Sequence, residues 1–408
     1  MEMALPQKTQ NRVKRAAAWI AETKEKGGKV VVAVGSGPNL HEGVTTLIAE
    51  LIHKGIIDGV CTSSALVAHE MAGGLEKVKR VNGEALGFDR TLLPADGFVE
   101  VSLLPEVRLK EMQREISIDL ALYRKMQRAK GNVIIKAAGN ISYPTGLRTE
   151  KVALEILAMA KRQGMPFEQV AGYGADPHTM LGAGAQNRRP VIVTVPQLVG
   201  GGWVGLAIGD SISISERCRR VAELLASADV IIESAIALAQ EIHDGPFETF
   251  TGHGIWSAWE GQETYSLSEK RVIRIDLDSQ LEKAWARERK CKMVSDAIHK
   301  GLPKTKLMRI PFRMEMSGFS RIPGSLPVIG DIGVIWPLLA NRVADALGIK
   351  LDFMSYPQSV PAGREVREWI VQHVQPVSRE RLMKAVGIPG LDRRSDWTVK
   401  NRLERGMY

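Results

Sequence analysis

Short, unbroken apolar segments alternate with helical periodicity along the chain, and this alternation constrains the fold more than any other feature. The apolar segments are 30–34, 57–61, 132–139, 190–195, 229–235 and 271–278. The segments with helical character are 44–53, one beginning at 65, 106–130, 149–162, 216–226 and 332–347. Continuous apolar strands separated by helices are typical of a mostly parallel sheet with helices on both faces. We therefore predict an α/β, Rossmann-like fold.

The ends of these strands are rich in small and hydrogen-bonding residues. They are 35–39, Thr62-Ser63-Ser64, 137–140, 196–202 and Glu233-Ser234. In open parallel sheets, ligands bind beyond the carboxyl ends of the strands. Any single turn of this kind is explained by the ordinary preference of turns for Gly, Ser and Asn. Five of them in one chain favour a shared ligand-binding edge.

The first of these turns reads Gly35-Ser36-Gly37-Pro38-Asn39. A dinucleotide fingerprint needs G-x-G-x-x-G, and Leu40 holds the third glycine position, so the ordinary Rossmann fingerprint fails. A P-loop is excluded because no Gly-Lys-Ser/Thr follows. The free N–H groups of a strand-to-helix turn and the start of a helix still attract phosphate.

Two regions carry candidate acid–base residues. His69 and Glu70 follow the second strand by about two helical turns. Adjacent helical residues point about 100° apart, so a surface Glu beside a partly buried His is an equally good interpretation. The segment 230–261 gathers Glu233, Glu241, His243, Asp244, Glu248 and His253 near Phe247, Trp256 and Trp259. Carboxylates beside aromatic rings suit an organic cation, whereas the plainer alternative is a surface loop anchored by tryptophan. Asp176 and His178 are weaker candidates.

Composition excludes several classes of protein. The chain has 408 residues, 44% of them hydrophobic and 25% charged, with a formal net charge of +9. Much of the positive excess lies in 287–309 without a nucleic-acid motif, so a solvated helix and loop is expected there and no nucleic-acid partner, with another anionic partner as the alternative. The apolar runs are too short to span a bilayer, so no membrane partner is expected. The N-terminus resembles an amphipathic helix rather than a signal peptide.

Cys61, Cys218 and Cys291 are too far apart in the sequence for a metal or redox pair. The His and acidic residues also lack the spacing of metal ligands, so no metal is expected. These features predict a cytoplasmic location.

The order of the motifs resembles two related NAD-binding families. Deoxyhypusine synthases have a Thr-Ser-Asn loop after one strand and Thr-Thr-Ala-Gly-Gly at the end of the next, and "GSGPNLHEG" and "CTSSALVAHEM" resemble these elements. Their Ala-Gln-Glu-Phe-Asp-Gly segment is similar to "DVIIESAIALAQEIHDG", and their Asp-Ala before a Pro-Leu-Leu helix is similar to "IGDIGVIWPLLANRV". The archaeal-type ornithine cyclodeaminase domain is the nearer resemblance, since it has a Gly-Pro loop with His-x-Gly, like "GPNLHEG". Its later Ala-x-His-Asp element is similar to "LVAHEM", and its Thr-Asp-Val-Gly segment to "GDIGV". The resemblance runs from about Lys29 to Leu347 and implies the deoxyhypusine synthase-like version of the Rossmann-like fold.

This resemblance implies a cofactor, a chemistry and a set of residues. It places NAD near Ser36, Gly37, Asn39, His41, Thr62, Ser63, Ser64, Glu233, Ser234, Asp331 and Ile332. Removal of hydride from a carbon that bears an amine gives an electrophilic imine, and a base such as His69 or His243, with Glu70 and Asp244 beside them, moves the protons. The lysine that follows tryptophan in deoxyhypusine synthases is missing, because the chain reads Ser257-Ala258-Trp259-Glu260-Gly261. Deoxyhypusine synthesis itself is therefore disfavoured.

We predict an N-terminal helix (1–28), an NAD-binding catalytic domain (29–350) with an insertion at about 285–325, and an α-rich C-terminal extension (351–408). The leading hypothesis is an ornithine cyclodeaminase-like lyase of amino acid metabolism that recycles NAD internally. Amine transfer or plain amine dehydrogenation is the alternative within the enzyme class, and a non-catalytic sensor of NAD or an amine is the alternative outside it. The expected partners are a small amine or amino acid and further copies of the chain, in a homodimer or homotetramer.

Overall fold

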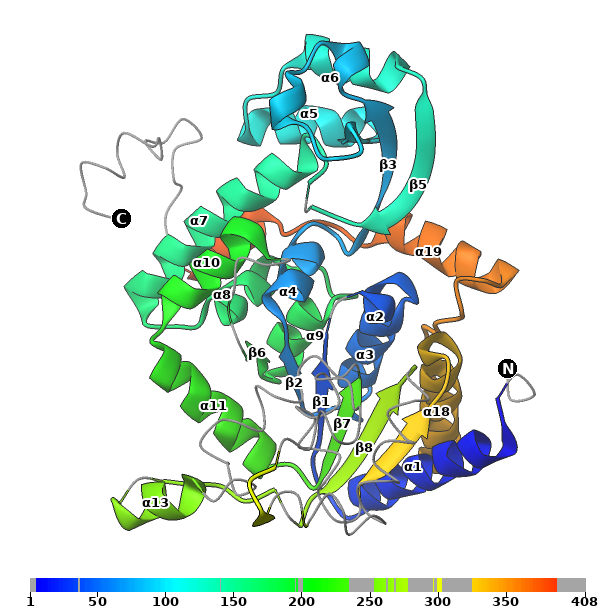
Figure 1. Cartoon of the computed structure of the whole chain (residues 1–408), viewed down its shortest axis with the longest axis vertical. Helices are drawn as coiled ribbons and strands as arrows, with labels where there is room; N and C mark the ends of the chain where they lie inside the picture. Colours follow the sequence, from blue (N-terminus) through cyan, green and yellow to red (C-terminus); the bar gives the residue numbers. More distant parts are fainter. Residues whose placement is uncertain are drawn as a thin grey trace.

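The protein is described by a computed structural model for residues 5–35, 37–139, 141–194, 196, 201–234, 253–261, 263–267, 269–277, 296, 299–302 and 325–386. In Figure 1 this part of the chain forms two lobes, a large one built on a six-stranded sheet and a small one built on a three-stranded sheet. The small lobe lies above the carboxyl ends of the strands of the large sheet, so the two lobes meet where the sequence predicts ligand binding.

All strands of the large sheet are parallel, in the order β6-β2-β1-β7-β8-β9. They are β1 (Val30–Val34), β2 (Gly59–Thr62), β6 (Val191–Val193), β7 (Val230–Ser234), β8 (Arg271–Asp276) and β9 (Leu326–Ile329). The central strand β1 is buried along its whole length, and Val31 pairs with Gly59 on one side while Val30 pairs with Val230 on the other. The predicted parallel α/β sheet is confirmed.

Helices cover both faces of this sheet. The helices of the large lobe and of the C-terminal region are α1 (Gln7–Glu25), α2 (Pro38–His41), α3 (Val44–His53), α4 (Ser64–Met71), α7 (Thr145–Gln163), α8 (Phe167–Gly174), α9 (Met180–Asn187), α10 (Gly202–Ser211), α11 (Ile214–Ala226), α13 (His253–Trp259), α18 (Ile332–Leu347), α19 (Pro361–His373) and α20 (Arg379–Val386). Val30, Val32 and Val34 of β1 pack in one core with α1, α3 and α18, whereas Val31 and Ala33 pack in another with α11. Within the described ranges, no helix has both the length and the apolar character needed to cross a membrane.

The small lobe is an insertion between α4 and α7 that the sequence did not predict as a separate unit. Its strands β4 (Phe98–Ser102), β3 (Leu75–Asn82) and β5 (Gly131–Ala137) form an antiparallel sheet in the order β4-β3-β5. The short turns η2 (Glu84–Leu86) and η3 (Arg90–Leu92) and the helices α5 (Glu106–Glu115) and α6 (Leu120–Arg128) complete the lobe. Tyr123 and Met126 of α6 pack against Val81 and Val101 to form its core.

Two sequence predictions for this region were wrong. The apolar run 132–139 was expected to end at the carboxyl edge of the parallel sheet, but β5 pairs antiparallel with β3, with Ile134 opposite Val78. An apolar run of this length does not distinguish a parallel strand from an antiparallel one, because only the pairing partner does. The single helix expected over 106–130 is two helices, since the chain is extended at Ile116 and Asp119 caps α6 by accepting from the N–H of Leu122 at 2.9 Å.

The two lobes are joined by adjacent chain segments and by the C-terminal extension. The chain enters the small lobe through Gly73 and Gly74 and returns at Ala138, whose N–H donates to the carbonyl of Gly74 at 2.9 Å. Ile370 of α19 packs with Leu40 of α2 and Leu75 of β3. The described part of the predicted C-terminal extension, 351–386, contains the two helices α19 and α20, and α19 contacts both lobes (Figure 1).

The return connection leaves no room for a side chain at Gly139, which has φ of +71°. A Cβ there would lie 2.2 Å from the Cβ of Ala72 and 2.8 Å from Oγ1 of Thr149. We predict that Gly139→Ala lowers the free energy of unfolding by about 2–4 kcal/mol, because backbone strain and overpacking add. Gly87→Ala is the matched control, since Gly87 has φ of +88° but no atom within 4 Å of a Cβ. Equal losses in the two variants, measured by urea unfolding, would contradict a crowded connection.

Candidate active site

The strand order marks one position of the sheet as the candidate ligand site. From β1 the chain passes to β2 and β6 on one side, and later to β7, β8 and β9 on the other. This order is equivalent to the 3-2-1-4-5-6 order of doubly wound nucleotide-binding folds, which bind dinucleotides where the order reverses. In this chain that position lies beside the carboxyl ends of β1 and β7.

A buried polar network holds this position in place. The hydroxyl of Ser234, at the end of β7, donates to Oδ1 of Asn39 at 2.7 Å and accepts from Nε1 of Trp336 at 2.9 Å. Nδ2 of Asn39 donates in turn to the carbonyls of Gly35 and Ser234, at 3.3 and 3.4 Å. All three side chains are almost fully buried. The side chains of Asn39 and Ser234 therefore hold the turn after β1 in place, and their polar atoms form hydrogen bonds with other protein atoms.

At Gly37 the turn after β1 presents backbone to the surface. Gly37 is exposed, has φ of +69° and comes directly before Pro38, the first residue of α2. A Cβ built at Gly35 or Gly37 would meet no atom within 4 Å. A left-handed φ is available to glycine at little cost, so the glycine at position 37 is required by the path of the chain.

The other residues expected near NAD fall into two groups. Buried side chains form the first group: Thr62, Ser64, Glu233 and Ile332. Oγ1 of Thr62 donates to the carbonyl of Val34 at 2.8 Å, and Glu233 lies 3.4 Å from Arg274 in an ion pair within the sheet. More accessible residues form the second group: His41, Ser63 and Asp331. Ser63 caps α4 and Asp331 caps α18, so each also has a structural role at the carboxyl edge.

His69 lies where the two lobes meet. Its Nδ1 is 2.8 Å from the carbonyl oxygen of Ala138, just after β5. A carbonyl only accepts, so Nδ1 carries the proton and Nε2 is the basic nitrogen of the neutral ring. Burial lowers the pKa of His69, the bond to Ala138 opposes this change, and the charges of Lys136 and His41 lower the pKa further. The imidazole is therefore held in one tautomer and is neutral near pH 7.

Glu70 points away from this meeting point and binds the start of α9. Its Oε1 accepts from the N–H of Met180 at 2.9 Å and its Oε2 accepts from the N–H of Leu181 at 3.0 Å. Burial raises the pKa of Glu70 to about 7, although these two bonds lower it. Both oxygens serve the packing of α9, so this geometry favours a structural role for Glu70. His69 and Glu70 act in different places despite being adjacent.

Two cations near this region, Arg367 on α19 and Lys136 on β5, were not among the residues predicted from the sequence. Burial lowers the pKa of His41, and the charges of these two cations lower it further. Nη2 of Arg367 donates to the carbonyl of Ile135 at 2.6 Å, and Nζ of Lys136 donates to Oε2 of Glu100 at 2.6 Å. No local motif marks these residues, because they reach the region only through the pairing of β5 and the packing of α19.

Several other predicted residues do not contribute to this site or lie outside the described residues. Ser36, His243 and Asp244 lie outside them. Trp256 and Trp259 lie on α13, far from the small lobe in Figure 1, and their exposed fractions are 68% and 84%. Asp176 and His178 contact each other at 2.9 Å in the turn before α9. Within the described ranges, no cluster of three or more His, Cys, Asp or Glu residues is arranged to hold a metal ion.

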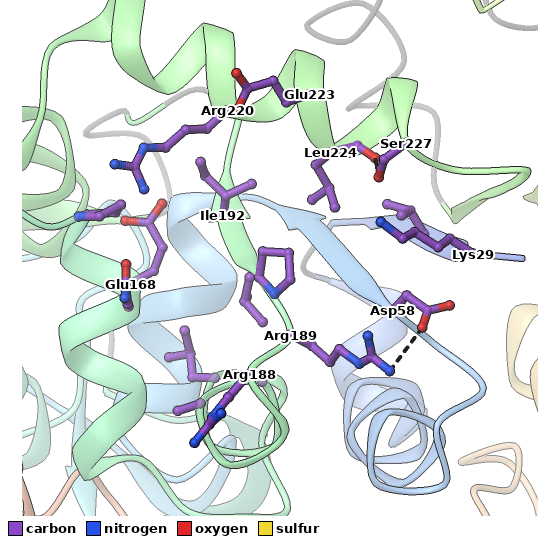
Figure 2. A pocket seen from close by; sticks show the side chains of 18 of the residues that line it. Lys29, Asp58, Glu168, Arg188, Arg189, Ile192, Arg220, Glu223, Leu224 and Ser227 are labelled. Carbon is purple, nitrogen blue, oxygen red and sulfur yellow. Dashed lines mark hydrogen bonds and ion pairs between the residues drawn. The ribbon is translucent and has the colours of Figure 1, made fainter. Parts of the chain in front are cut away.

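A groove of about 840 Å³ lies at the other end of the strands (Figure 2). Its lining includes Lys29, Asp58 and Pro190, which directly precede β1, β2 and β6. Its charges are largely paired: Asp58 lies 3.2 Å from Arg189, as the dashed line in Figure 2 shows, and Glu168 is paired with the buried Arg217. None of the predicted site residues that the structure describes lines this groove, so we place the candidate site at the carboxyl edge.

The pKa of Glu70 gives a test of its structural role. The unfolded chain loses this proton near pH 4.5, while the folded chain keeps it to about pH 7. This contribution to stability is complete below pH 4.5 and is lost as the pH rises to 7, by up to about 3 kcal/mol. We predict that the wild type minus Glu70→Gln difference in unfolding free energy, from urea titrations at pH 5 to 8, falls with rising pH. A flat or rising difference would contradict the account.

No family model matches the chain. Among solved structures, it is similar to a conserved LOR/SDH protein from Methanococcus maripaludis S2, with 12% identity, a TM-score of 0.40, and coverage of 84% of this chain and 69% of that one. It is also similar to AgrE in a ternary complex with ornithine and NAD⁺ (12% identity, TM-score 0.41, coverage 84% and 34%). A third similar structure is ArgZ, an arginine dihydrolase from the ornithine-ammonia cycle in cyanobacteria (12% identity, TM-score 0.36, coverage 82% and 32%). The chain spans about a third of the length of AgrE and ArgZ.

Proposed function

We propose that the protein is an NAD-dependent enzyme that acts on an amino acid through an imine intermediate. One observation carries the proposal: the strand order reverses at β1, and Gly35 and Gly37 follow this strand at the edge above which the small lobe lies. Dinucleotides bind at this position in folds with the same strand order. His69, held by the small lobe at the same edge, supplies the group for proton transfer.

The residues at this edge fit NAD in several respects. Exposed Gly37, with its left-handed backbone, allows a pyrophosphate to approach the turn closely, as glycine does in other dinucleotide folds. His41, Ser63 and Asp331 are the accessible polar side chains among the predicted contacts. The end of β2 carries Thr62-Ser63-Ser64 rather than the acidic residue usual at a ribose, so hydroxyl groups would take that role. When bound, NAD would accept a hydride from the carbon bearing the amine.

His69 supports the proton transfer that this chemistry requires. An amino acid arrives with a protonated amine, and its nitrogen must lose a proton before an imine forms. A neutral imidazole with a free lone pair on Nε2 is in the correct state to accept this proton. The lowered pKa of His69 keeps it in this state at neutral pH.

The charges around His41 and His69 favour an amino acid over a simple amine. Lys136 and Arg367 lower the pKa of His41, and Lys136 also lowers that of His69. Cations that disfavour protonation of two histidines would attract the carboxylate of an amino acid and hold it beside His69. The side chain of Lys136 is also bound to Glu100, so an incoming carboxylate would share this ammonium.

Within this class, a cyclodeaminase-like reaction with internally recycled NAD is the version that the "GPNLHEG" resemblance supports. Plain dehydrogenation is the second candidate, and it differs in releasing NADH to solution. Aminoalkyl transfer has less support, because no lysine follows Trp259. A non-catalytic sensor of NAD or an amine would bind both ligands without turnover.

We predict that His69→Asn lowers kcat for amino acid deamination by about 10²–10⁴-fold, the usual range for a lost general base. Binding of NAD should be unchanged, because the asparagine amide can still donate to Ala138. The matched control is His53→Asn, since His53 is exposed at the end of α3 and contacts the carbonyl of Pro177. Ammonia release from a panel of amino acids with NAD is the measurement. Full activity of His69→Asn would exclude the proposed base, and binding without turnover in the wild type would favour the sensor.

A further inference from the structure

We infer that Glu76 is a positioning residue that raises the basicity of His69 through the peptide group between Ala138 and Gly139. This inference rests on the proposed function only in giving His69 a catalytic role. The coupling between the two side chains follows from the contacts themselves.

The contacts form one continuous chain of hydrogen bonds. Nδ1–H of His69 donates to the carbonyl oxygen of Ala138 at 2.8 Å. The N–H of Gly139 donates to Oε1 of Glu76 at 3.0 Å. The carbonyl of Ala138 and the N–H of Gly139 belong to the same planar peptide unit. A carboxylate and an imidazole are thus joined through one amide, with the base nitrogen Nε2 at the far end.

Glu76 is built into this position. It is the second residue of β3, its exposed fraction is 8%, and it lies opposite Lys136 in the register of β3 and β5. Oε1 also accepts from the hydroxyl of Ser142. Among the described residues, Oε2 has no hydrogen-bond partner although it is buried. In the part of the chain that the structure describes, the donors to this carboxylate are thus the hydroxyl of Ser142 and the N–H of Gly139, both at Oε1.

The physical effect is polarisation of the amide. A carboxylate at the N–H end draws the peptide dipole toward itself and makes the carbonyl oxygen a stronger acceptor, because hydrogen bonds in a chain strengthen one another. A stronger acceptor at Nδ1–H stabilises the imidazolium form and so raises the basicity of Nε2. Burial, Lys136 and His41 act on His69 in the opposite direction. Glu76 limits how far they lower its pKa.

The arrangement also links the base to the assembly of the two lobes. His69 belongs to α4 of the large lobe and Glu76 to β3 of the small lobe, while the amide is the connection through which the chain returns. Gly139 accepts no Cβ at this point, since Ala72 would be 2.2 Å away. The connection is therefore held in the one place where its amide reaches both side chains.

Two substitutions with opposite expected effects test the inference. Glu76→Gln keeps an oxygen to accept from Gly139 but removes the charge, so the pKa of His69 should fall by about 0.5–1 unit. Ser142→Ala leaves the carboxylate with fewer donors, which strengthens its bond to Gly139, and the pKa of His69 should rise. Glu155→Gln is the control, because Glu155 is similarly buried (6% exposed) but pairs with Arg379 of α20 at 2.6 Å.

The measurement is an NMR titration of the His69 imidazole in the full-length protein, together with the pH profile of kcat/KM. In Glu76→Gln the acidic limb of the profile should move to lower pH by the same amount as the NMR pKa. An unchanged NMR pKa of His69 in both variants would overturn the inference, whatever the activity. If Glu76→Gln does not fold, Ser142→Ala alone decides between a rise and no change. Shifted NMR values in a protein without turnover would support the coupling and refute the proposed function.

Discussion

The hydroxyl of Ser234 is the contact on which the candidate site most depends. It donates to Asn39 in the turn after β1 and accepts from Trp336 in α18, so it joins three elements that are distant in the sequence. The hydroxyl, the amide and the indole N–H are buried and satisfy one another, which avoids the cost of leaving polar groups unpaired in a core. The N–H of Gly35 also donates to the carbonyl of Ser234 at 3.4 Å, and the side-chain network adds to this backbone contact in holding the turn against β7. The backbone of Gly37 is exposed at the surface, whereas the buried hydrogen bonds of Asn39 and Ser234 hold the turn in position.

The second lobe adds chemistry that the large sheet does not contain. The carboxyl edge offers glycine, serine and asparagine, which suit a cofactor, but few groups that move protons. The small lobe and α19 bring Ala138, Lys136 and Arg367 to this edge, where they fix the tautomer of one histidine and lower the pKa of two. In the proposed function, the open α/β sheet provides the cofactor position and the inserted antiparallel sheet provides the environment of the base.

The sequence was sufficient for five strands of the large sheet, but it missed the edge strand β9 and did not define the site. Strands such as β1 are apolar on both faces and are followed by turn residues, so their type and their common edge could be predicted. Segment 44–53 was predicted with the bounds that α3 has. The small lobe was missed because β5 is as apolar as a parallel strand, and its pairing with β3 is not a local property. Glu70 shows the same limit, because its contacts with α9 bridge more than 100 residues.

Several polar residues expected near NAD have structural contacts that the sequence pattern does not reveal. Asn39, Thr62 and Ser234 do lie at the carboxyl edge, yet their polar atoms bind neighbouring backbone and side chains. A polar residue at a strand end can either face a ligand or hold the turn that does, and the sequence pattern is the same. Burial separates the two cases, and burial depends on helices such as α18 that arrive much later in the chain.

The central claim is that NAD binds at the carboxyl ends of β1 and β7. Hydrogen exchange followed by mass spectrometry, with and without NAD, tests it most directly. The account predicts that NAD slows exchange in the peptides covering 35–43 and 62–66, while peptides from the groove at 185–192 are unchanged. Slowed exchange confined to that groove, or no change anywhere at saturating NAD, would contradict it.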